Sequence, residues 1–398
     1  MSAALGEQVQ RFRDADRPRS ALLRIDPLLL IAAVGLIVCS VYVIGQATED
    51  DIPGDPNYYE LRQAIYAVVG VSLMLVIARF DYSRLRELKL GVYASMIGLI
   101  LLVFALATAT RGSKRWIELP FFRLQPSELG KVLLIVALSA FTVDRVRRLG
   151  ERETTSRLLL LAIVPAILVV VQPDLGSGLV YMAIAAAVLF VAGTKWTHFA
   201  ALGAIAAVIV AGVLVAGPAV GVEVLKDYQK DRLTAFVNPT DDPREQGYQL
   251  QQSTVAIGSG EKTGRGAEGA TQTRLDFLPE HHTDFVFSVV GEMFGFAGAA
   301  FVLSLYALLI WRALRILTMA KNLYGTLIVG GVVAMLMFQV FVNVGMTIGL
   351  GPITGVPLPL MSYGGSSVLV TFMAIGLLQS VHVQARLTSD AKRRELVV

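Results

Sequence analysis

Residues 25–46 read IDPLLLIAAVGLIVCSVYVIGQ, an apolar run with one charged side chain, Asp26. A run of about 20 such residues is long enough for a helix to cross the hydrocarbon core of a bilayer. Similar runs recur along the chain, whose 398 residues are 55% hydrophobic and have a mean hydropathy of +0.62. One soluble core cannot hide that much apolar surface, so the composition predicts a polytopic integral membrane protein.

The apolar runs are continuous rather than alternating, which favours helices over a β-barrel. We therefore expect an all-α fold of about ten transmembrane helices. The fifth and sixth spans are separated by little more than Gln172-Pro173-Asp174, so they could instead form one broken helix, which would invert the topology after it. The expected spans lie near residues 25–46, 61–80, 88–109, 127–144, 157–172, 176–194, 198–216, 284–311, 325–349 and 364–384.

Lys and Arg residues indicate the orientation, because they are retained on the cytoplasmic side of short loops. Basic clusters follow the second, fourth, eighth and tenth spans, and all four fall on one side when the N-terminus is inside. We then expect residues 1–24 and the tail 385–398 in the cytoplasm, on either side of a membrane domain at 25–384. A large extracytoplasmic loop at 217–283, between spans 7 and 8, lies outside together with Asp284.

The large loop contains two patterns of its own. Residues 222–237 alternate apolar and charged side chains, as in a helix that lies flat on the membrane interface. Residues 247–269 are rich in glycine without a repeat, which favours an irregular or re-entrant stretch packed against protein.

Four basic residues break the orientation rule, because they lie in an expected outer loop between the third and fourth spans. An anionic ligand such as a phosphate would compensate this charge, or the loop tolerates it because the rule is statistical. These residues are Arg111, Lys114, Arg115 and Arg123.

A carboxylate, Asp284, lies where the large loop meets the eighth span, within the sequence PEHHTDF at 279–285. Ionisable groups beside hydrocarbon are costly, so Asp284 is a candidate for chemistry. The alternative is an acid at a helix start, which the backbone dipole favours. The neighbouring His281 and His282 are expected to be solvated loop residues. The sequence has neither a His-Glu-x-x-His motif nor a pair of cysteines to indicate zinc.

Two further acidic positions lie at expected helix starts. Glu128 and Lys131 are three residues apart, so they share a helical face and can pair, either to lock helix packing or to line a cavity. Asp174 follows a helix break, where an acid is commonly a cap but could also belong to a site on the outer face.

The eighth span carries an acidic residue, Glu292, whose partner the sequence does not name. It also carries a stripe of small side chains, which favours close helix packing over a ligand site. The stripe consists of Ser288, Gly291, Gly295 and Gly298.

Asn343 in the ninth span is expected to donate hydrogen bonds between helices. The following residues 351–367 are dense in proline and glycine, which predicts irregular backbone at membrane depth. Such backbone is allowed only where protein or a wet cavity supports it. Together with Asp284, this stretch predicts a pocket that faces outward.

Two classes of partner are excluded by what the sequence lacks. There is no Walker phosphate loop, so no nucleotide is expected and the reaction would draw on an already activated substrate. The basic residues lie beside membrane segments and not in a groove interleaved with aromatic residues, so nucleic acid is not an expected partner.

Four separated motifs together resemble the shape, elongation, division and sporulation (SEDS) family of bacterial cell-wall glycosyltransferases. The resemblance covers nearly the whole membrane region, and residues 345–349 and 354–357 are more similar to elongation members than to division members. Gly351 stands where leucine is usual and Glu261 where glycine is common, which affects only the expected loop conformation. The motifs are Arg115-Trp116 with Gln125-Pro126-Ser127-Glu128 and Lys131; Gln172-Pro173-Asp174-Leu175-Gly176; Phe277-Leu278-Pro279-Glu280 running into His282-Thr283-Asp284-Phe285; and Pro357-Leu358-Pro359 with Ser362-Tyr363-Gly364-Gly365-Ser366-Ser367.

The resemblance implies polymerisation of lipid II, an undecaprenyl-pyrophosphate-linked disaccharide pentapeptide, at the outer face of the bacterial plasma membrane during cell elongation. Asp284 would be the general base or, if a divalent cation such as Mg²⁺ or Mn²⁺ binds, its ligand. Positive charge would stabilise the leaving group, and the candidates for this role are Arg111, Lys114, Arg115 and Lys131. The other substrate-binding candidates are Trp116, Gln125, Ser127, Glu128, Asp174, His282, Ser362, Tyr363 and Ser366.

The family also implies partners: a class B penicillin-binding protein, which is a transpeptidase, and other membrane proteins of the elongation complex. The alternative functions are a lipid II flippase, a division-type polymerase and a non-catalytic scaffold. A flippase would show charged residues reaching both faces and an inverted repeat, and the sequence shows neither.

Overall fold

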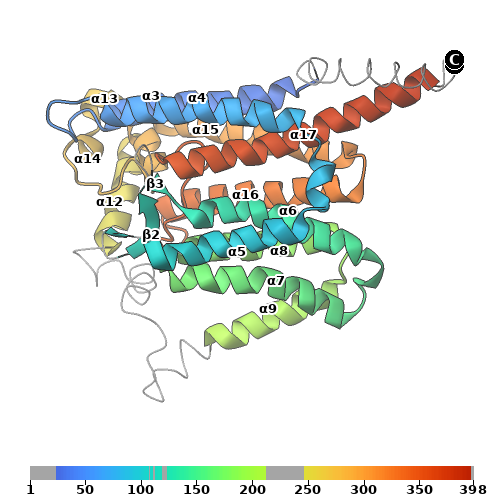
Figure 1. Cartoon of the computed structure of the whole chain (residues 1–398). Helices are drawn as coiled ribbons and strands as arrows, with labels where there is room; N and C mark the ends of the chain where they lie inside the picture. Colours follow the sequence, from blue (N-terminus) through green and yellow to red (C-terminus); the bar gives the residue numbers. More distant parts are fainter. Residues whose placement is uncertain (1–23, 107, 111–112, 119–122, 212–245, 396–398) are drawn as a thin grey trace.

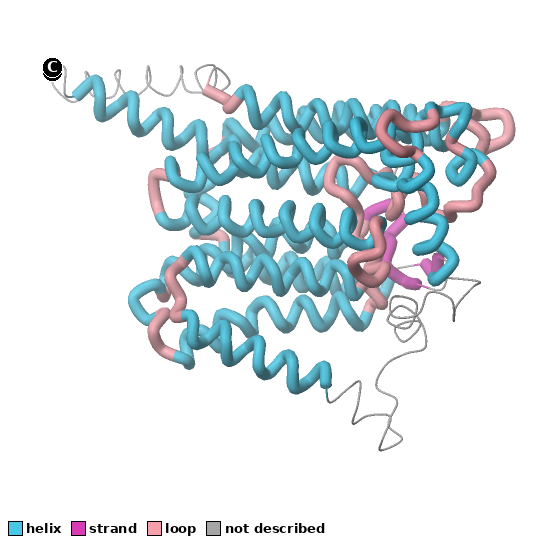
Figure 2. The backbone as a smooth tube through the Cα atoms, turned by 180° about the vertical axis from the view of Figure 1, so that it is seen from behind, coloured by secondary structure: helices cyan, strands magenta, loops and turns pink. Residues whose placement is uncertain are grey.

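The structure of the protein, a computed structural model, describes residues 24–106, 108–110, 113–118, 123–211 and 246–395. Within these residues ten long helices run back and forth in one bundle (Figure 1), which Figure 2 shows from behind. They are α3 (Pro27–Ala47), α4 (Tyr58–Arg79), α5 (Lys89–Leu106), α6 (Pro126–Asp144), α7 (Arg152–Val171), α8 (Leu175–Val191), α9 (Trp196–Ala211), α15 (Val286–Met319), α16 (Leu323–Thr347) and α17 (Gly365–Glu395).

Each long helix coincides with one expected span, so the all-α membrane fold is confirmed. Eight of these described helices are long and apolar enough to cross a bilayer; α8 has 17 residues and the described part of α9 has 16. Helices α7 and α8 form a hairpin and not one broken helix. A Cβ on Gly178 would meet the Val170 side chain at 2.6 Å and the Ala166 carbonyl oxygen at 3.4 Å. The topology that follows is therefore that of ten separate spans.

The two ends of the bundle differ (Figure 1). One end, here called the site end, carries the α3–α4 loop, three strands and the short helices α12 (Gln246–Ser259), α13 (Gly266–Gly269) and α14 (Thr271–Arg274). The start of α3 and the end of α17 lie at the opposite end, where Arg24 pairs with Asp390 at 3.0 Å.

The basic clusters that indicated the orientation lie together at the end opposite the site. Some of their charges pair with acids there. Arg86 and Lys89 share the carboxylate of Asp144, which lies 2.8 Å from Arg86. Arg312 on α15 binds Asp26, the buried N-cap of α3, with Nε 3.1 Å from Oδ2. These ion pairs tie neighbouring helices together where the helices leave the bundle.

A small antiparallel sheet, which the sequence analysis did not predict, lies in the loop between α5 and α6. Its strands β1 (Thr108–Thr110), β2 (Ser113–Glu118) and β3 (Arg123–Leu124) are hydrogen-bonded in that order. Two motif residues lie next to each other on β2, so Arg115 and Trp116 point to opposite faces of the strand.

The described part of the large loop is more regular than expected. Residues 246–259 form helix α12, whereas the irregular glycine-rich stretch is confined to the turn at 260–265. The expectation of irregular backbone from 247 onward is therefore wrong for the first half, because α12 finds a helix surface to pack on. The expected flat helix at 222–237 lies outside the described residues.

Helix α12 packs on the small-residue stripe of α15. The hydroxyl groups of Ser253 and Ser288 lie 2.6 Å apart, and a Cβ on Gly291 would meet Ile257 at 3.0 Å. The close packing inferred from the stripe is confirmed.

Helix α15 is interrupted at Gly295, whose φ of +61° and ψ of −158° are not helical. The turn at 260–265 supplies the hydrogen bonds that the helix loses. The N–H of Phe296 donates to the Glu261 oxygen at 2.9 Å, and the N–H of Ala297 donates to the Lys262 oxygen at 3.0 Å. Glu261, the residue that departs from the family pattern, adopts a φ of +47°, a conformation that glycine adopts at lower cost.

The partner of Glu292 is the start of helix α14. Its fully buried carboxylate accepts from the backbone N–H groups of Gln272 at 2.8 Å and Thr273 at 3.1 Å, and from the Thr273 hydroxyl at 2.7 Å. Glu292 therefore fastens the loop to the membrane helix, with its charge placed at a helix N-terminus where the dipole favours it.

We expect Gly260→Ala to destabilise the protein by about 1–3 kcal/mol, because the new Cβ would lie 1.9 Å from the Gly291 carbonyl oxygen. Gly258→Ala is the matched control, since no atom lies within 4 Å of the added carbon, and a helical Gly→Ala change costs nothing and gains at most about 1 kcal/mol. Thermal unfolding in detergent measures both. Equal melting temperatures for the two variants would contradict the packing of the turn on α15.

Candidate active site

Asp284 lies in a tight turn that precedes α15. The Glu280 carbonyl oxygen accepts hydrogen bonds from the backbone N–H groups of Thr283 at 3.1 Å and Asp284 at 3.2 Å. The N-cap of α15 is Phe285, so Asp284 lies one residue outside the helix, and its side chain is half-buried. The carboxylate thus sits at the end of a membrane helix, at the site end of the bundle.

Two neighbouring segments hold this turn: α16 and the α16–α17 loop, residues 348–364. The Asn343 side-chain amide donates to the carbonyl oxygens of Asp284 and Val356, both at 2.9 Å. Gly355 approaches the carboxylate, because a Cβ built there would lie 3.6 Å from Asp284 Oδ2. Asn343 donates hydrogen bonds as predicted, but its two acceptors lie in the loops that border the site and not in another helix.

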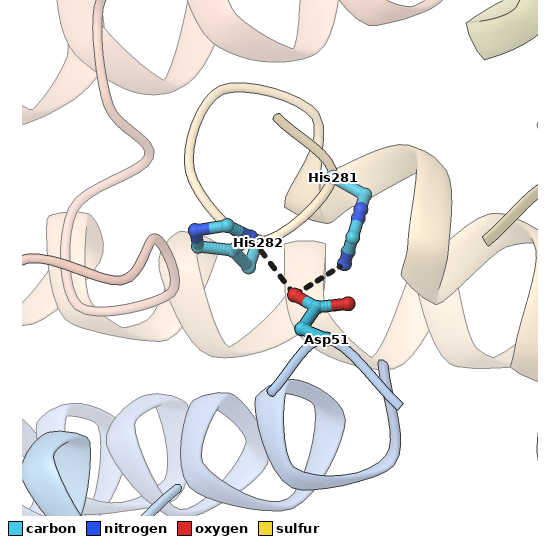
Figure 3. Close-up of side chains that lie close together, drawn as sticks. All are labelled: Asp51, His281 and His282. Carbon is cyan, nitrogen blue, oxygen red and sulfur yellow. Dashed lines mark ion pairs between the residues drawn. The ribbon is translucent and has the colours of Figure 1, made fainter. Parts of the chain in front are cut away.

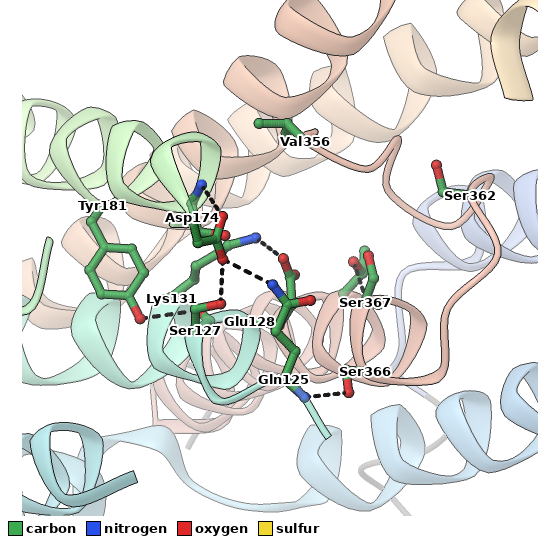
Figure 4. A network of polar contacts seen from close by, with 12 residues as sticks. Gln125, Ser127, Glu128, Lys131, Asp174, Tyr181, Val356, Ser362, Ser366 and Ser367 are labelled. Carbon is green, nitrogen blue, oxygen red and sulfur yellow. Dashed lines mark hydrogen bonds and ion pairs between the residues drawn. The ribbon is translucent and has the colours of Figure 1, made fainter. Parts of the chain in front are cut away.

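Asp174 is a helix cap, one of the two roles that the sequence left open, and its second oxygen bonds to the start of another helix. Its Oδ1 accepts from the Ser177 N–H at 3.1 Å and caps α8. Its Oδ2 accepts from Gln125 Nε2 at 2.9 Å and from the Ser127 hydroxyl at 2.8 Å (Figure 4). Three donors satisfy this buried carboxylate, which joins the start of α6 to the start of α8.

The predicted pairing of Glu128 with Lys131 is confirmed. The Lys131 ammonium lies 2.5 Å from Glu128 Oε1, and the two residues are 1% and 3% exposed, respectively. Figure 4 shows the pair beside the Asp174 network. Because both charges are buried, each neutralises the other inside the protein.

The Asp174 network and Asp284 are linked, because the α16–α17 loop touches both. A Cβ on Gly176, two residues after Asp174, would meet the Val356 side chain at 2.6 Å. Gly355, the residue before Val356, borders the Asp284 carboxylate. The helix starts of α8 and α15 therefore face one stretch of irregular backbone, which protein supports as the sequence analysis predicted.

The serines of the last motif are engaged within the protein. The Ser362 hydroxyl accepts from the Leu358 N–H at 2.8 Å. The Ser366 hydroxyl accepts from the Gln125 N–H at 3.0 Å and donates to the Arg123 oxygen at 2.7 Å. These bonds fix the ends of the α16–α17 loop, and a role for either hydroxyl in binding substrate stays a prediction.

Tyr363 and His282 form an aromatic cluster with Tyr59 of α4. The Tyr59 ring centroid lies 4.7 Å from that of His282 and 5.0 Å from that of Tyr363, and the two tyrosine rings are nearly perpendicular. The Tyr363 N–H donates to the His282 carbonyl oxygen at 2.9 Å. Burial raises the pKa of the Tyr363 hydroxyl, so this group stays protonated in the cellular pH range.

The cations expected to stabilise a leaving group differ in their surroundings. Arg111 and the side chain of Lys114 lie outside the described residues. Arg123 is exposed and pairs with an acid on β2 at 3.7 Å, and Lys131 is held by its buried carboxylate. Arg115 is half-buried, and its Nε has no hydrogen-bond partner among the described residues.

Three side chains that can bind metal meet beside the Asp284 turn (Figure 3). His281 Nε2 lies 3.5 Å and His282 Nδ1 lies 3.8 Å from Asp51 Oδ2. Among the described residues this is the one group of three His, Cys, Asp or Glu side chains close enough to share an ion, and Asp284 is not part of it.

The expectation that His281 is a solvated loop residue is wrong, because the side chain is 4% exposed. The α3–α4 loop covers it and brings Asp51 against its ring. Burial lowers the pKa of His281, but the Asp51 carboxylate, the Leu278 carbonyl oxygen and the charge of Asp276 together raise it, so the net pKa is above the usual value. Sequence reasoning could not find this contact, since Asp51 and His281 lie far apart in the sequence and only the fold brings them together.

An apolar cavity of about 430 Å³ lies between α3 and α15 on the membrane side of the site. It begins near Val290, six residues after Asp284, which places it about 9 Å further along the helix. Its walls include Cys39, Tyr42, Val43, Val290, Phe294 and Phe301.

We expect Lys131→Met to destabilise the protein by about 3–5 kcal/mol, because it leaves the buried Glu128 carboxylate without a counter-ion. Adding Glu128→Leu removes the stranded charge and restores most of that stability. The control is Arg157→Met, which breaks an ion pair on α7 that is 68% and 73% exposed and should cost less than about 0.5 kcal/mol.

Thermal unfolding and lipid II polymerisation by the purified variants measure these effects. Full activity of the double variant would make the pair purely structural. A cost for Lys131→Met no larger than that of Arg157→Met would contradict the buried ion pair.

Comparison with known proteins places the chain in a family. The family model described as "Cell cycle protein", which spans FtsW, RodA and SpoVE, matches residues 22–387. The peptidoglycan glycosyltransferase MrdB of Escherichia coli (strain K12) is 35% identical over 369 residues, which are 93% of this chain and 96% of that protein. A probable peptidoglycan glycosyltransferase FtsW of Geobacter metallireducens is 37% identical over 372 residues, covering 91% and 96%.

Solved structures agree in fold. The rod shape determining protein RodA of Thermus thermophilus superposes with a TM-score of 0.64 at 27% identity, covering 90% of this chain and 96% of that one. A chain from a study of the structural coordination of polymerization and crosslinking by a peptidoglycan synthase complex gives a TM-score of 0.75 at 29% identity, covering 91% and 98%.

The chain therefore belongs to the FtsW, RodA and SpoVE family, the SEDS family that its motifs resemble. The similarity to elongation members such as RodA is confirmed.

Proposed function

We propose that this chain polymerises lipid II into glycan strands at the outer face of the plasma membrane, with Asp284 as the general base. That it is a peptidoglycan glycosyltransferase follows from its family and from the activity that curated relatives share. The observation that supports a role for Asp284 is its position. It is a half-buried carboxylate at the end of a membrane helix, bordered by the irregular loop that also contacts the Asp174 turn.

The reaction needs one base and one source of positive charge. A sugar 4-hydroxyl oxygen attacks the anomeric carbon of a second lipid-linked sugar, and the bond from that carbon to the pyrophosphate oxygen breaks. The hydroxyl proton passes to the Asp284 carboxylate, and the electron pair leaves with the pyrophosphate. The Arg115 guanidinium, whose Nε has no partner among the described residues, is suited to stabilise that developing charge.

The apolar cavity between α3 and α15 supports a substrate that carries a lipid. A polyprenyl chain needs an apolar path beside the membrane, and the walls of this cavity are almost entirely hydrocarbon and aromatic side chains. The cavity lies next to the membrane half of α15, so a lipid chain held there would keep its pyrophosphate near the site end.

A divalent cation such as Mg²⁺ or Mn²⁺ fits the donor chemistry of Asp284. Mg²⁺ is typically held by one or two carboxylates together with substrate phosphates, so a single carboxylate beside a pyrophosphate is a sufficient protein contribution. In this alternative Asp284 would hold the ion instead of acting as the general base, and the ion would offset the charge of the leaving pyrophosphate.

The proposed orientation puts the site end outside and both termini in the cytoplasm. The basic loops gathered at the opposite end support this, because Lys and Arg are retained inside. The proposed partners are a class B penicillin-binding protein and other membrane proteins of the elongation complex. The similarity to a chain studied for coordinated polymerization and crosslinking supports the transpeptidase partner.

We expect Asp284→Asn to reduce glycan-strand synthesis by about 10²–10⁴-fold, the usual contribution of a general base. Folding should be unchanged, because Asn has nearly the size and shape of Asp and the backbone hydrogen bonds of the turn remain. The control is Asp55→Asn, an exposed acid of the α3–α4 loop at the same end. The assay is polymerisation of lipid II by purified protein, with gel filtration to check folding. Polymerisation by Asp284→Asn at the rate of Asp55→Asn would remove Asp284 from the mechanism.

Supplying lipid II to one leaflet only distinguishes a polymerase from a flippase. Vesicles in which the site end faces outward, with lipid II supplied only to the outer leaflet, should produce strands, because the polymerase meets its substrate there. The measurement is gel analysis of labelled lipid II, with Asp284→Asn as the inactive control. Movement of lipid II to the inner leaflet without strands would favour a flippase.

A further inference from the structure

We propose that Asp51, His281 and His282 form a binding site for a divalent transition-metal ion, with Zn²⁺ as the best fit, which joins the α3–α4 loop to the Asp284 turn. This site is separate from the Mg²⁺ or Mn²⁺ that Asp284 itself is suited to hold. Its existence does not depend on the proposed polymerisation reaction.

The hydrogen bond of His281 is made by Nδ1, so its other ring nitrogen, Nε2, is available to bind a metal ion. Its Nδ1 lies 3.2 Å from the Leu278 carbonyl oxygen, which can only accept, so Nδ1 carries the proton. Nε2 then points at Asp51 from a ring that is 4% exposed, and it makes no hydrogen bond among the described residues. Histidines that bind metal commonly donate their second ring N–H to a backbone carbonyl in this way.

The separations suit a tetrahedral ion. Ligand atoms about 2.0–2.1 Å from a tetrahedral Zn²⁺ lie about 3.3 Å from one another. The two nitrogens are 3.5 and 3.8 Å from Asp51 Oδ2, and all three ligand atoms lie within 4.8 Å of one another. Binding of an ion would draw the three ligand atoms closer together, to the tetrahedral spacing. An ideal octahedral Mg²⁺ needs neighbouring ligands closer together, at about 2.9 Å.

The ligand types select the same class of ion. Two imidazoles and one carboxylate suit Zn²⁺ and its first-row neighbours, whereas Mg²⁺ and Ca²⁺ prefer oxygen ligands alone. The site is covered but not sealed, because the side chains of Asp51 and His282 are 17% and 16% exposed. Three protein ligands leave a fourth position for water or another ligand.

A bound ion would fasten the turn at a point two residues before Asp284. The turn is already held from the other side by Asn343, and His282 is flanked by Tyr59 and Tyr363. The ion would add a tie to the α3–α4 loop and place positive charge near the proposed reaction centre. The rival explanation is a metal-free ion pair between protonated His281 and Asp51.

The first test is direct measurement of metal binding. Protein purified without a histidine tag is stripped with a chelator, dialysed against buffered Zn²⁺ and analysed for bound metal. We expect about one ion per chain. We expect each of three single changes to weaken Zn²⁺ binding by about 100-fold: Asp51→Asn, His281→Gln and His282→Gln. Loss of a group that only hydrogen-bonds a metal ligand already lowers metal affinity 10–100-fold.

Two controls and one rescue variant sharpen this test. Asp50→Asn changes the adjacent acid, which is 71% exposed, and His198→Gln removes a distant imidazole that contacts Thr155. Both should bind Zn²⁺ as the wild type does. Asp51→His replaces the carboxylate with a third imidazole and should keep the ion, since three histidines form an established zinc site. Wild-type binding by Asp51→Asn, or absence of binding in the wild type, would overturn the proposal.

A second measurement is independent of enzymatic activity. Zn²⁺ should raise the melting temperature of the chelated wild type and of Asp50→Asn, but not that of Asp51→Asn, because an ion that binds only the folded state stabilises it. Co²⁺ should give the visible absorption of tetrahedral coordination in the wild type. No metal-dependent shift in the wild type, with Asp51→Asn melting lower in metal-free buffer, would identify the ion pair instead. Loss of polymerisation in Asp284→Asn has no bearing on either readout.

Discussion

The side-chain amide of Asn343 is the contact on which the geometry of the site depends. One NH₂ group donates to the backbone of two loops, at Asp284 and at Val356, each at 2.9 Å. Backbone at this depth has little water to satisfy it, so loops are possible only where protein supplies the hydrogen bonds. A single polar residue on α16 thereby lets two irregular segments lie against each other at the end of a membrane bundle. The position of Asp284 is thus fixed through its main chain, by a hydrogen bond from a neighbouring helix.

The charges around the site are distributed unevenly. The charges of Lys131 and Glu128 neutralise each other. The Asp174 carboxylate accepts three hydrogen bonds within the protein. These groups join the start of α6 to the start of α8. Asp284 and Arg115 differ from them, because Asp284 is only half-buried and the Arg115 Nε has no partner among the described residues.

The helices could be predicted from the sequence because each is an apolar run about as long as the hydrocarbon core of a bilayer is thick. It also predicted local pairs such as Glu128 with Lys131, since helical spacing alone brings them together. It could not predict contacts between residues that only the fold brings together. The partner of Glu292 is a helix N-terminus in the large loop, and the cover of His281 is a loop from the start of the chain. The small sheet was missed because two of its three strands, β1 and β3, are too short to show an alternating pattern.

The break in α15 at Gly295 has a mechanical consequence. Backbone groups on both sides of the break are hydrogen-bonded to residues 261–265 of the large loop. The loop therefore completes the hydrogen bonding of the membrane helix at this point. Lipid offers no replacement for those bonds. The part of α15 before Gly295, which the Asp284 turn precedes, is thus held by the large loop. The part after Gly295 is the one expected to cross the bilayer. A force applied to the loop from outside the membrane would reach Asp284 through covalent and hydrogen-bonded backbone alone.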